Sequence, residues 1–68
     1  MIKTLLVNGS RRTFDRAETL AEVLESLGLD ARAVVVEHNR GIVRRPELAA
    51  TAVADGDQIE IVHFVGGG

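Results

Sequence analysis

The period of the hydrophobic pattern changes twice along the chain, and this limits the possible folds more than any other feature. Apolar residues recur at i, i+3, i+4 and i+7 from Leu20 to Leu27, which is the pattern of one face of a helix. Short segments typical of strands lie on both sides, at residues 2–7, 11–14 and 58–64. One helix among several strands predicts an α+β domain.

Local signals mark the ends of the helix and the first turn. Thr19 is followed three residues later by Glu22, a spacing that fits a capping box at the start of the helix. Gly28 stands where a helix C-cap is expected. Asn8-Gly9 is a strong turn signal because both residues tolerate a positive φ, so the first two strands are predicted to form a hairpin.

The second half of the chain supplies the remaining strands. Residues 33–37 are apolar and β-branched, which predicts a central strand, whereas residues 42–43 form at most a short edge strand. Pro46 begins a helical turn at residues 47–50, where its missing N–H costs nothing. The order predicts a β-grasp, ubiquitin-like architecture, with a mixed four- to five-stranded sheet and one main helix packed on one face.

The composition argues against several classes of function. The chain contains no cysteine, which excludes a disulfide, a thiolate metal site and a thiol nucleophile. Its two histidines are too few for a metal cluster, and its net charge of −2 argues against nucleic-acid binding. No apolar run approaches the ~20 residues that span a bilayer, and the N-terminus has no signal-peptide pattern. We therefore expect a soluble cytoplasmic protein that binds no metal, nucleic acid or membrane.

Three glycines, Gly66, Gly67 and Gly68, follow directly after the last predicted strand. Residues without Cβ cannot build a core, and they lose much entropy when they are ordered. We predict a folded domain at residues 1–64 and a flexible tail at residues 65–68 that reaches roughly 13 Å and presents an unhindered carboxylate to a partner. The alternatives are an inert terminus or a cloning remnant.

The last strand predicts a docking surface beside this tail. Glu60 marks the solvent-facing side of the strand, and the alternation then exposes Val62 and Phe64 on the same side. Val35 is expected on this side too, while its two neighbours in sequence face the helix. Because an exposed apolar patch beside a tail is typical of an interaction site, we predict that Val35, Val62 and Phe64 contact partners.

No side chain is predicted to act in catalysis or to bind a metal. His63 is expected to point inward with Ile61 and to be structural, and His38 is expected to lie in a turn. Phe14 is expected in the core at the end of the second strand.

The remaining charged residues have structural explanations. Asp55 and Asp57 flank a turn glycine and are too few for a calcium loop. Arg40, Arg44 and Arg45 either meet an acidic partner surface or are solvated charges.

Three stretches together resemble the ThiS family, the sulfur carriers of bacterial thiamine biosynthesis. They are LLVNG at residues 5–9, VVVEHN at residues 34–39 and DGDQIEIVHFVGGG at residues 55–68, of which the last is the most specific. The resemblance covers essentially the whole chain. It implies a carrier rather than an enzyme.

The resemblance also implies a reaction at the carboxyl group of Gly68. A ThiF-like adenylating enzyme would use ATP and Mg²⁺ to form an acyl-adenylate there, and a sulfur donor such as a cysteine desulfurase would convert it to a thiocarboxylate. Thiazole synthase, a ThiG-like enzyme, would receive the sulfur. Gly66 and Gly67 would keep the tail narrow and extend its reach.

Other functions remain compatible with the same residues. The chain resembles sulfur carriers of other pathways, such as the small subunit of molybdopterin synthase, in fold and tail. A protein modifier joined through Gly68 to lysines would also end in glycine, and a plain interaction domain would have an inert tail. An enzyme is least favoured because the sequence has no nucleophile, metal cluster or carboxylate pair suited to catalysis.

Overall fold

A computed structural model gives the structure of the protein and describes residues 2–64. The predicted tail at residues 65–68 lies outside the described residues. The elements, in chain order, are β1 (Lys3–Val7), β2 (Ser10–Phe14), α1 (Leu20–Ser26), η1 (Ala31–Ala33), β3 (Val34–His38), β4 (Gly41–Val43), η2 (Arg45–Ala50) and β5 (Gln58–His63).

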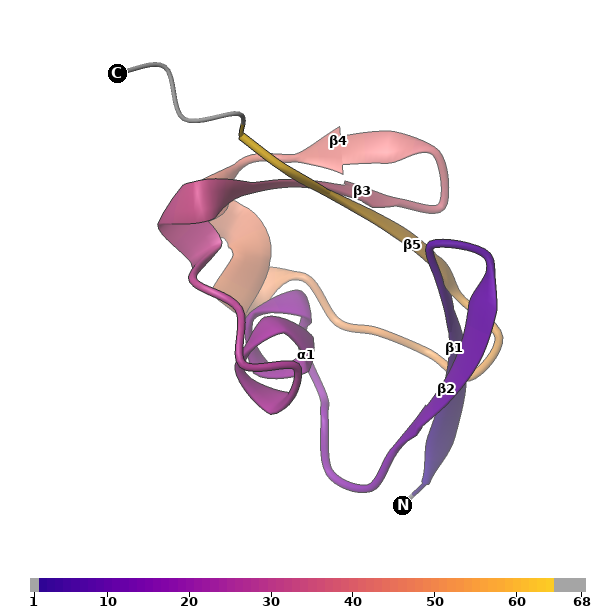
Figure 1. Ribbon diagram of the computed structural model, residues 1–68. Coiled ribbons are helices and arrows are strands. Elements are labelled where there is room, and N and C mark those ends of the chain that lie inside the picture. The colour runs from indigo at the N-terminus through magenta and orange to yellow at the C-terminus, as the bar shows by residue number, and fades with distance from the viewer. Residues whose placement is uncertain (1, 65–68) are drawn as a thin grey trace.

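The strands form one mixed sheet of five strands in the order β2-β1-β5-β3-β4 (Figure 1). β1 and β5 are parallel, and the other neighbours are antiparallel. The last strand of the chain therefore lies in the middle of the sheet. β3, predicted as a central strand, lies between β5 and the edge strand β4.

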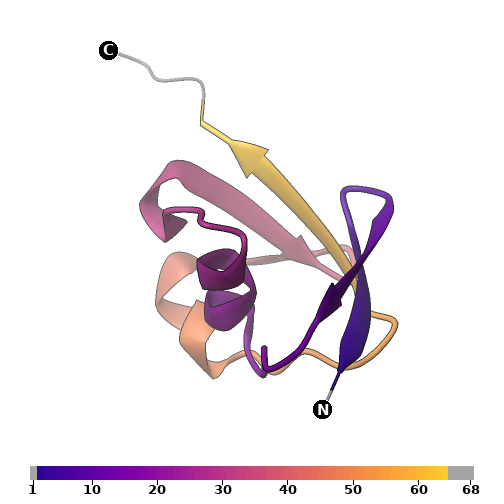
Figure 2. The ribbon, with the colours of Figure 1, turned by 60° about the horizontal axis from the view of Figure 1, so that its bottom comes forward.

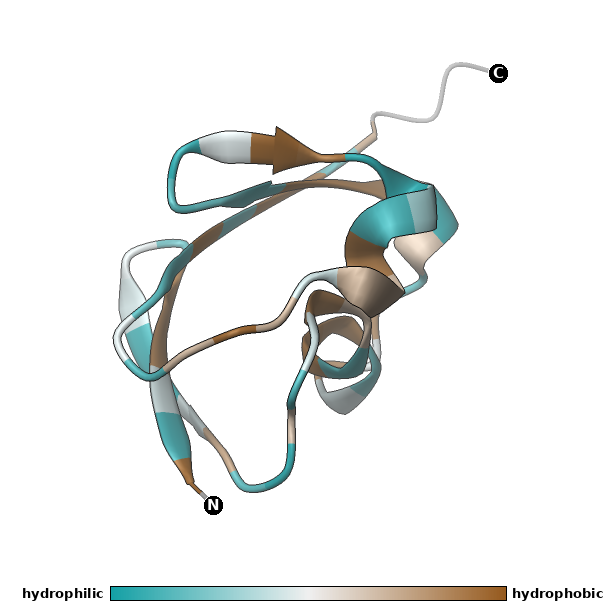
Figure 3. Cartoon of the chain, turned by 180° about the vertical axis from the view of Figure 1, so that it is seen from behind, coloured by the Kyte–Doolittle hydropathy of each residue, from teal (hydrophilic) through white to brown (hydrophobic). Residues whose placement is uncertain are grey.

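The main helix covers one face of this sheet, and η2 lies beside it (Figures 1 and 2). Leu20, Val23 and Leu24 of α1 are buried, as the helical pattern predicted. They belong to a single core that also includes Leu5, Val7, Phe14, Ala17, Val34, Val36, Leu48, Val53, Ile59 and Ile61. The architecture is the predicted β-grasp arrangement. Figure 3 shows that hydrophobic residues gather in the strands and in α1, whereas the turns are hydrophilic.

The local signals act as the sequence indicated. Thr19 Oγ1 accepts a hydrogen bond from the Glu22 amide at 3.3 Å, and Glu22 Oε1 accepts one from the Thr19 amide at 3.1 Å, which completes the capping box. Gly28 has a φ of 73°, in the left-handed region that ends helices. Asn8 and Gly9 have φ values of 51° and 81°, as a tight hairpin turn requires.

Among residues 2–64, no helix combines the length and the apolar character needed to cross a membrane.

Candidate functional site

The side of the sheet away from α1 carries the predicted docking residues. In β5, Ile59 and Ile61 are buried, while Val62 is 61% exposed and Phe64, just after the strand, is 60% exposed. Val35 lies directly opposite Val62 in the β3–β5 register and is half-buried. The predicted phase of β5 is confirmed, because a one-residue shift would have exchanged the buried and exposed sets.

A fourth apolar residue, Ile42, extends this surface and was missed by the sequence analysis. It lies on the edge strand β4 opposite Glu37 and is 69% exposed. Paired residues in antiparallel strands share a face, so Ile42 lies on the same side as Val35. We call Val35, Ile42, Val62 and Phe64 the outer patch. The sequence could have indicated the position of Ile42 through the length of the turn between β3 and β4. That length determines which residues of the two strands lie opposite each other.

The backbone at Phe64 is fixed, although it follows the last residue of β5. Its amide donates a hydrogen bond to the Ala33 carbonyl at 2.9 Å, which continues the β3–β5 pairing by one residue. The outer patch therefore reaches the point where residue 65 begins. The predicted roles of Gly66, Gly67 and Gly68 concern residues outside the described range and stay predictions.

A groove of about 440 Å³ adjoins the outer patch beside Phe64. Val35, Ile42 and Phe64 of the patch line it together with Pro46 of η2. Three arginines also line it, and they are Arg32, Arg44 and Arg45. We call this feature the tail-proximal groove. Apolar and cationic groups thus lie next to each other at the end of β5.

One of these arginines is already paired. The Arg32 guanidinium lies 3.0 Å from a carboxylate oxygen of Asp30, and Asp30 also accepts a hydrogen bond from the Arg32 amide at 2.9 Å. The side-chain hydrogen bond from Arg32 is the main reason that the pKa of Asp30 lies below its ordinary value. No described residue forms a close ion pair with the side chain of Arg44 or Arg45, although the positive charge of Arg45 also contributes to lowering the pKa of Asp30.

Asn8 has a long-range role that its turn signal does not indicate. Its side-chain amide donates to the Ile61 carbonyl at 3.1 Å, and its Oδ1 accepts from the Ile61 amide at 2.7 Å. The backbone pairing of β1 with β5 stops before the turn at Gly9. The Asn8 side chain continues it by making the two hydrogen bonds to Ile61 that the backbone of a longer β1 would make. It therefore holds β5 in position close to the outer patch.

His63 does not lie where the sequence analysis placed it. It shares a shallow hollow with Ile61, Leu27 and Leu29, so the predicted side of the strand is correct, but the residue is exposed rather than turned into the core. The reason is the length of the helix, since α1 ends at Ser26 and leaves this end of β5 uncovered. The prediction of an inward histidine is therefore wrong.

His38 is also corrected, because it ends β3 rather than lying in a turn. Its Nε2 lies 2.7 Å from Asp57 Oδ2, and both side chains are only 16% exposed. Asp57 accepts further hydrogen bonds from the amide of Ala54 at 2.8 Å and from the side chain of Asn39 at 3.3 Å. Sequence reasoning explained Asp57 by its turn alone and missed this pair, which lies 19 residues apart in the chain.

The environment of Asp57 shifts its pKa downward. Burial acts to raise the pKa, but the hydrogen bonds from His38, Ala54 and Asn39 outweigh it and favour the carboxylate. The pair joins the turn before β5 to the end of β3, at the opposite end of β5 from the outer patch. We therefore assign it a structural role. Within residues 2–64, no three acidic, histidine or cysteine side chains gather in a way that could hold a metal ion.

The chain is similar to known proteins over most of its length. The model of the ThiS family matches residues 5–68. The sulfur carrier protein ThiS of Bacillus subtilis is 42% identical over 50 residues, which cover 74% of this chain and 76% of the relative. A crystal structure of a thiamine biosynthesis protein (ThiS) from Geobacter metallireducens is 41% identical, with a TM-score of 0.81 and coverage of 96% of this chain and 99% of that chain.

Two further relatives are longer proteins. A thiazole synthase of Paramagnetospirillum magneticum is 47% identical over 64 residues, and these cover 94% of this chain but 20% of the relative. A thiazole synthase of Magnetococcus marinus is 39% identical over 62 residues, or 91% of this chain and 19% of the relative. The chain thus spans about a fifth of the length of these two enzymes.

Proposed function

Because the chain belongs to the ThiS family, we propose that it is a sulfur carrier of thiamine biosynthesis, with Gly68 as the residue that carries the sulfur. The observation that carries the proposal is the family match, which extends through β5 and the glycines to residue 68. The exposed outer patch beside the last strand supports it, because a carrier needs a surface on which its partners dock.

The proposed chemistry takes place on the terminal carboxyl group in three steps. A ThiF-like adenylating enzyme binds ATP and Mg²⁺, and a carboxylate oxygen of Gly68 attacks the α-phosphorus, so that pyrophosphate leaves and an acyl-adenylate forms. The terminal sulfur of a persulfide, supplied by a donor such as a cysteine desulfurase, then attacks the carboxyl carbon and forms an acyl disulfide, which a thiol reductant cleaves by forming a disulfide with the donor's sulfur. The C–S bond forms as AMP leaves, and the thiocarboxylate remains once the thiol has cleaved the S–S bond.

In this proposal the chain is a cosubstrate and its partners supply the catalysis. Its contribution is a rigid surface and a reactive group on a narrow tether, which together bring the carboxyl carbon to the partner's active site. Glycine suits the position because no side chain obstructs attack on that carbon. Since the activating step consumes ATP, we place the protein in the cytoplasm.

We propose thiazole synthase, a ThiG-like enzyme, as the acceptor of the sulfur. The two thiazole synthases that contain a segment similar to this chain support the choice. In such a relative, a carrier-like segment and the enzyme would belong to one polypeptide and would meet at a high effective concentration. By analogy, we expect this chain to bind a thiazole synthase. In this proposal Val35, Val62 and Phe64 contact the partners, and Ile42 joins them.

A gene deletion tests the pathway. We expect the deletion strain to require thiamine and to grow again when it is given the thiazole precursor, since only that branch would lack sulfur. The intact gene should restore growth without the precursor, whereas a version lacking Gly67 and Gly68 should not. Growth that depends instead on a molybdoenzyme product, or high-mass conjugates of the chain on a blot, would contradict the proposal.

A further inference from the structure

We propose that the tail-proximal groove binds a segment of a partner protein that carries carboxylate groups next to an apolar side chain. The inference rests on the proposed function, because a carrier must be held by the proteins that load and unload it. It adds the chemistry of the partner surface, which the family match does not give.

The floor of the groove requires an apolar group. Ile42 and Phe64 are 69% and 60% exposed, and they face a space of about 440 Å³ together with Val35 and Pro46. β4 presents its hydrophobic residues at the free edge of the sheet, as Figure 3 shows. An aliphatic or aromatic side chain placed here would remove apolar surface from water on both partners.

The rim of the groove requires negative charge. Arg44 and Arg45 line the groove, and no described residue forms a close ion pair with either side chain, although Arg45 is near enough to Asp30 for its charge to act on that carboxylate. Arg44 directly follows β4 in an extended conformation, and it lines the groove together with Ile42. Two neighbouring guanidinium groups are suited to bidentate hydrogen bonds with carboxylates. This local positive charge stands out on a chain whose net charge is −2.

On the other side of the outer patch, two glutamates would repel a segment that carries carboxylates. Glu37 and Glu60 lie directly opposite each other in the β3–β5 register, on the face that carries Val35 and Val62. Two like charges in this arrangement repel a carboxylate that approaches from their side. The charges around the patch therefore allow one orientation of an acidic partner, with its carboxylates over Arg44 and Arg45.

The position of the groove connects this contact to the tail. Phe64 lines the groove, and its amide is bonded to the Ala33 carbonyl, so the backbone of Phe64 is held in place beside any bound segment. A partner held at the groove would therefore lie beside the residue that precedes the tail.

The test is the rate at which the chain associates with the adenylating enzyme and with thiazole synthase, measured separately by stopped flow at low salt. We expect the double variant Arg44→Glu/Arg45→Glu to associate more slowly with at least one of them, on the order of tenfold, because it reverses the steering charge. The difference should shrink as salt is raised, since the charges are exposed. The variant Arg44→Lys/Arg45→Lys should keep most of the rate.

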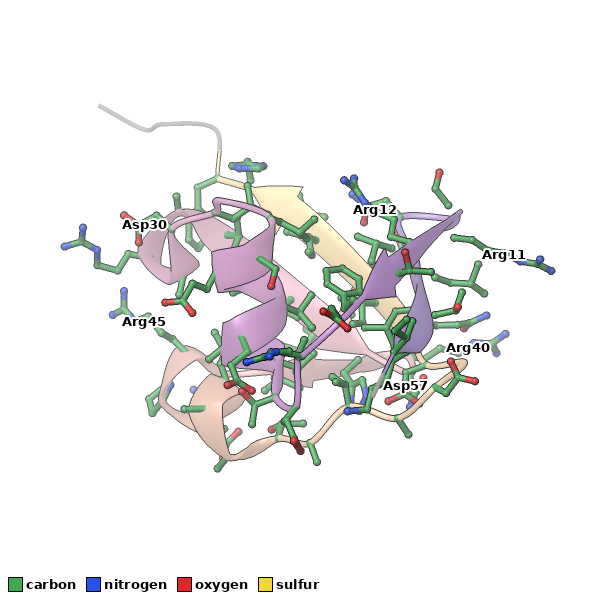
Figure 4. The ribbon with its side chains drawn as sticks, turned by 90° about the horizontal axis from the view of Figure 1, so that it is seen from below. Arg11, Arg12, Asp30, Arg40, Arg45 and Asp57 are labelled. Carbon is green, nitrogen blue, oxygen red and sulfur yellow. The ribbon has the colours of Figure 1, made fainter. Side chains whose placement is uncertain are left out.

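The matched control is Arg11→Glu/Arg12→Glu, which makes the same change in net charge on β2. Figure 4 shows Arg11 and Arg12 on the opposite side of the molecule from Arg45. This control should associate with nearly the wild-type rate, and circular dichroism should show that all variants are folded. Equal loss in the two reversals would show that only net charge matters, and it would overturn the inference.

Two other results would also overturn it. One is an unchanged rate of Arg44→Glu/Arg45→Glu with both enzymes. The other is a change confined to self-association, seen by sedimentation, which would assign the groove to a second copy of the chain. Neither result touches the proposed function, which fails separately if wild-type protein gains no sulfur at Gly68 when it is incubated with its activating enzyme.

Discussion

At the scale of single residues, Asn8 links two segments that the chain separates by 53 residues. Its backbone forms the turn, while its side chain satisfies both the amide and the carbonyl of Ile61. Asn8→Gly keeps a residue that tolerates the positive φ and removes only the side-chain bonds. We expect the free energy of unfolding to fall by about 1–3 kcal/mol, since each of the two bonds contributes about 0.5–1.5 kcal/mol.

Asn8→Asp is the matched variant for this prediction, because it keeps the acceptor for the Ile61 amide and loses the donor to the Ile61 carbonyl. It should lose stability to an intermediate extent in urea unfolding. Equal stability of Asn8→Gly and the wild type would show that water replaces the side chain at no cost.

Because of Asp57, the free energy of unfolding is expected to fall at acidic pH. The pKa of Asp57 is lower in the folded protein than in the unfolded chain, so its contribution is present above the ordinary aspartate pKa, about 3.9, and is lost as the pH falls through the lowered value. Asp57→Asn should reduce the free energy of unfolding at pH 7 by about 1–2 kcal/mol, because the hydrogen bonds to a charged acceptor are lost. The variant should also lose less stability than the wild type between pH 5 and the acid range.

Urea unfolding at a series of pH values measures both effects. Glu25→Gln is a suitable control, because Glu25 is an exposed carboxylate on α1. Identical pH profiles of Asp57→Asn and the wild type would contradict the assignment of Asp57 as an acid-sensitive contact.

At the scale of the elements, β5 has one face in the core and one face in the outer patch. Phe64→Asp should change the free energy of unfolding by no more than about 0.5 kcal/mol, because the side chain is exposed. It should weaken partner binding at least about tenfold, because it places a charge in an apolar contact. Ile61→Asp is the matched control, and it should unfold the protein, since it buries an unpaired charge.

Thermal melts followed by binding titrations separate the two outcomes. If Phe64→Asp unfolded the chain, the patch would be part of the core. If the variant folded and bound partners normally, the patch would not be the docking surface.

The elements themselves were predictable where the signal is local. The capping residues of α1, the Asn8-Gly9 turn and the alternation of β5 act within a few residues, and each led to the correct structure. The roles of Asn8 and of the His38–Asp57 pair depend on contacts between distant segments, which exist only after the sheet has formed. The exposure of His63 depends on where α1 stops relative to β5, and a pattern within one strand does not contain that information.

At the scale of the whole molecule, the last strand of the chain runs through the middle of the sheet and ends beside the outer patch. The central position of β5 ties its last residues to neighbours on both sides, through Asn8 and through Ala33. The outer patch and the tail-proximal groove both lie at this end of the strand. The candidate docking face was predicted in part, since Val62 and Phe64 follow from alternation, but Ile42 and the groove require the pairing of β3 with β4.

The most direct test of the central claim is the mass of the intact protein after incubation with its adenylating enzyme, ATP, Mg²⁺ and a sulfur source. Exchange of one carboxyl oxygen for sulfur adds about 16 Da, which is also the gain from oxidation of Met1, so fragmentation must locate the change. We predict that the gain lies on Gly68, requires ATP and is absent from a chain that lacks Gly67 and Gly68. A wild-type protein that keeps its original mass, or gains mass only at Met1, would contradict the account.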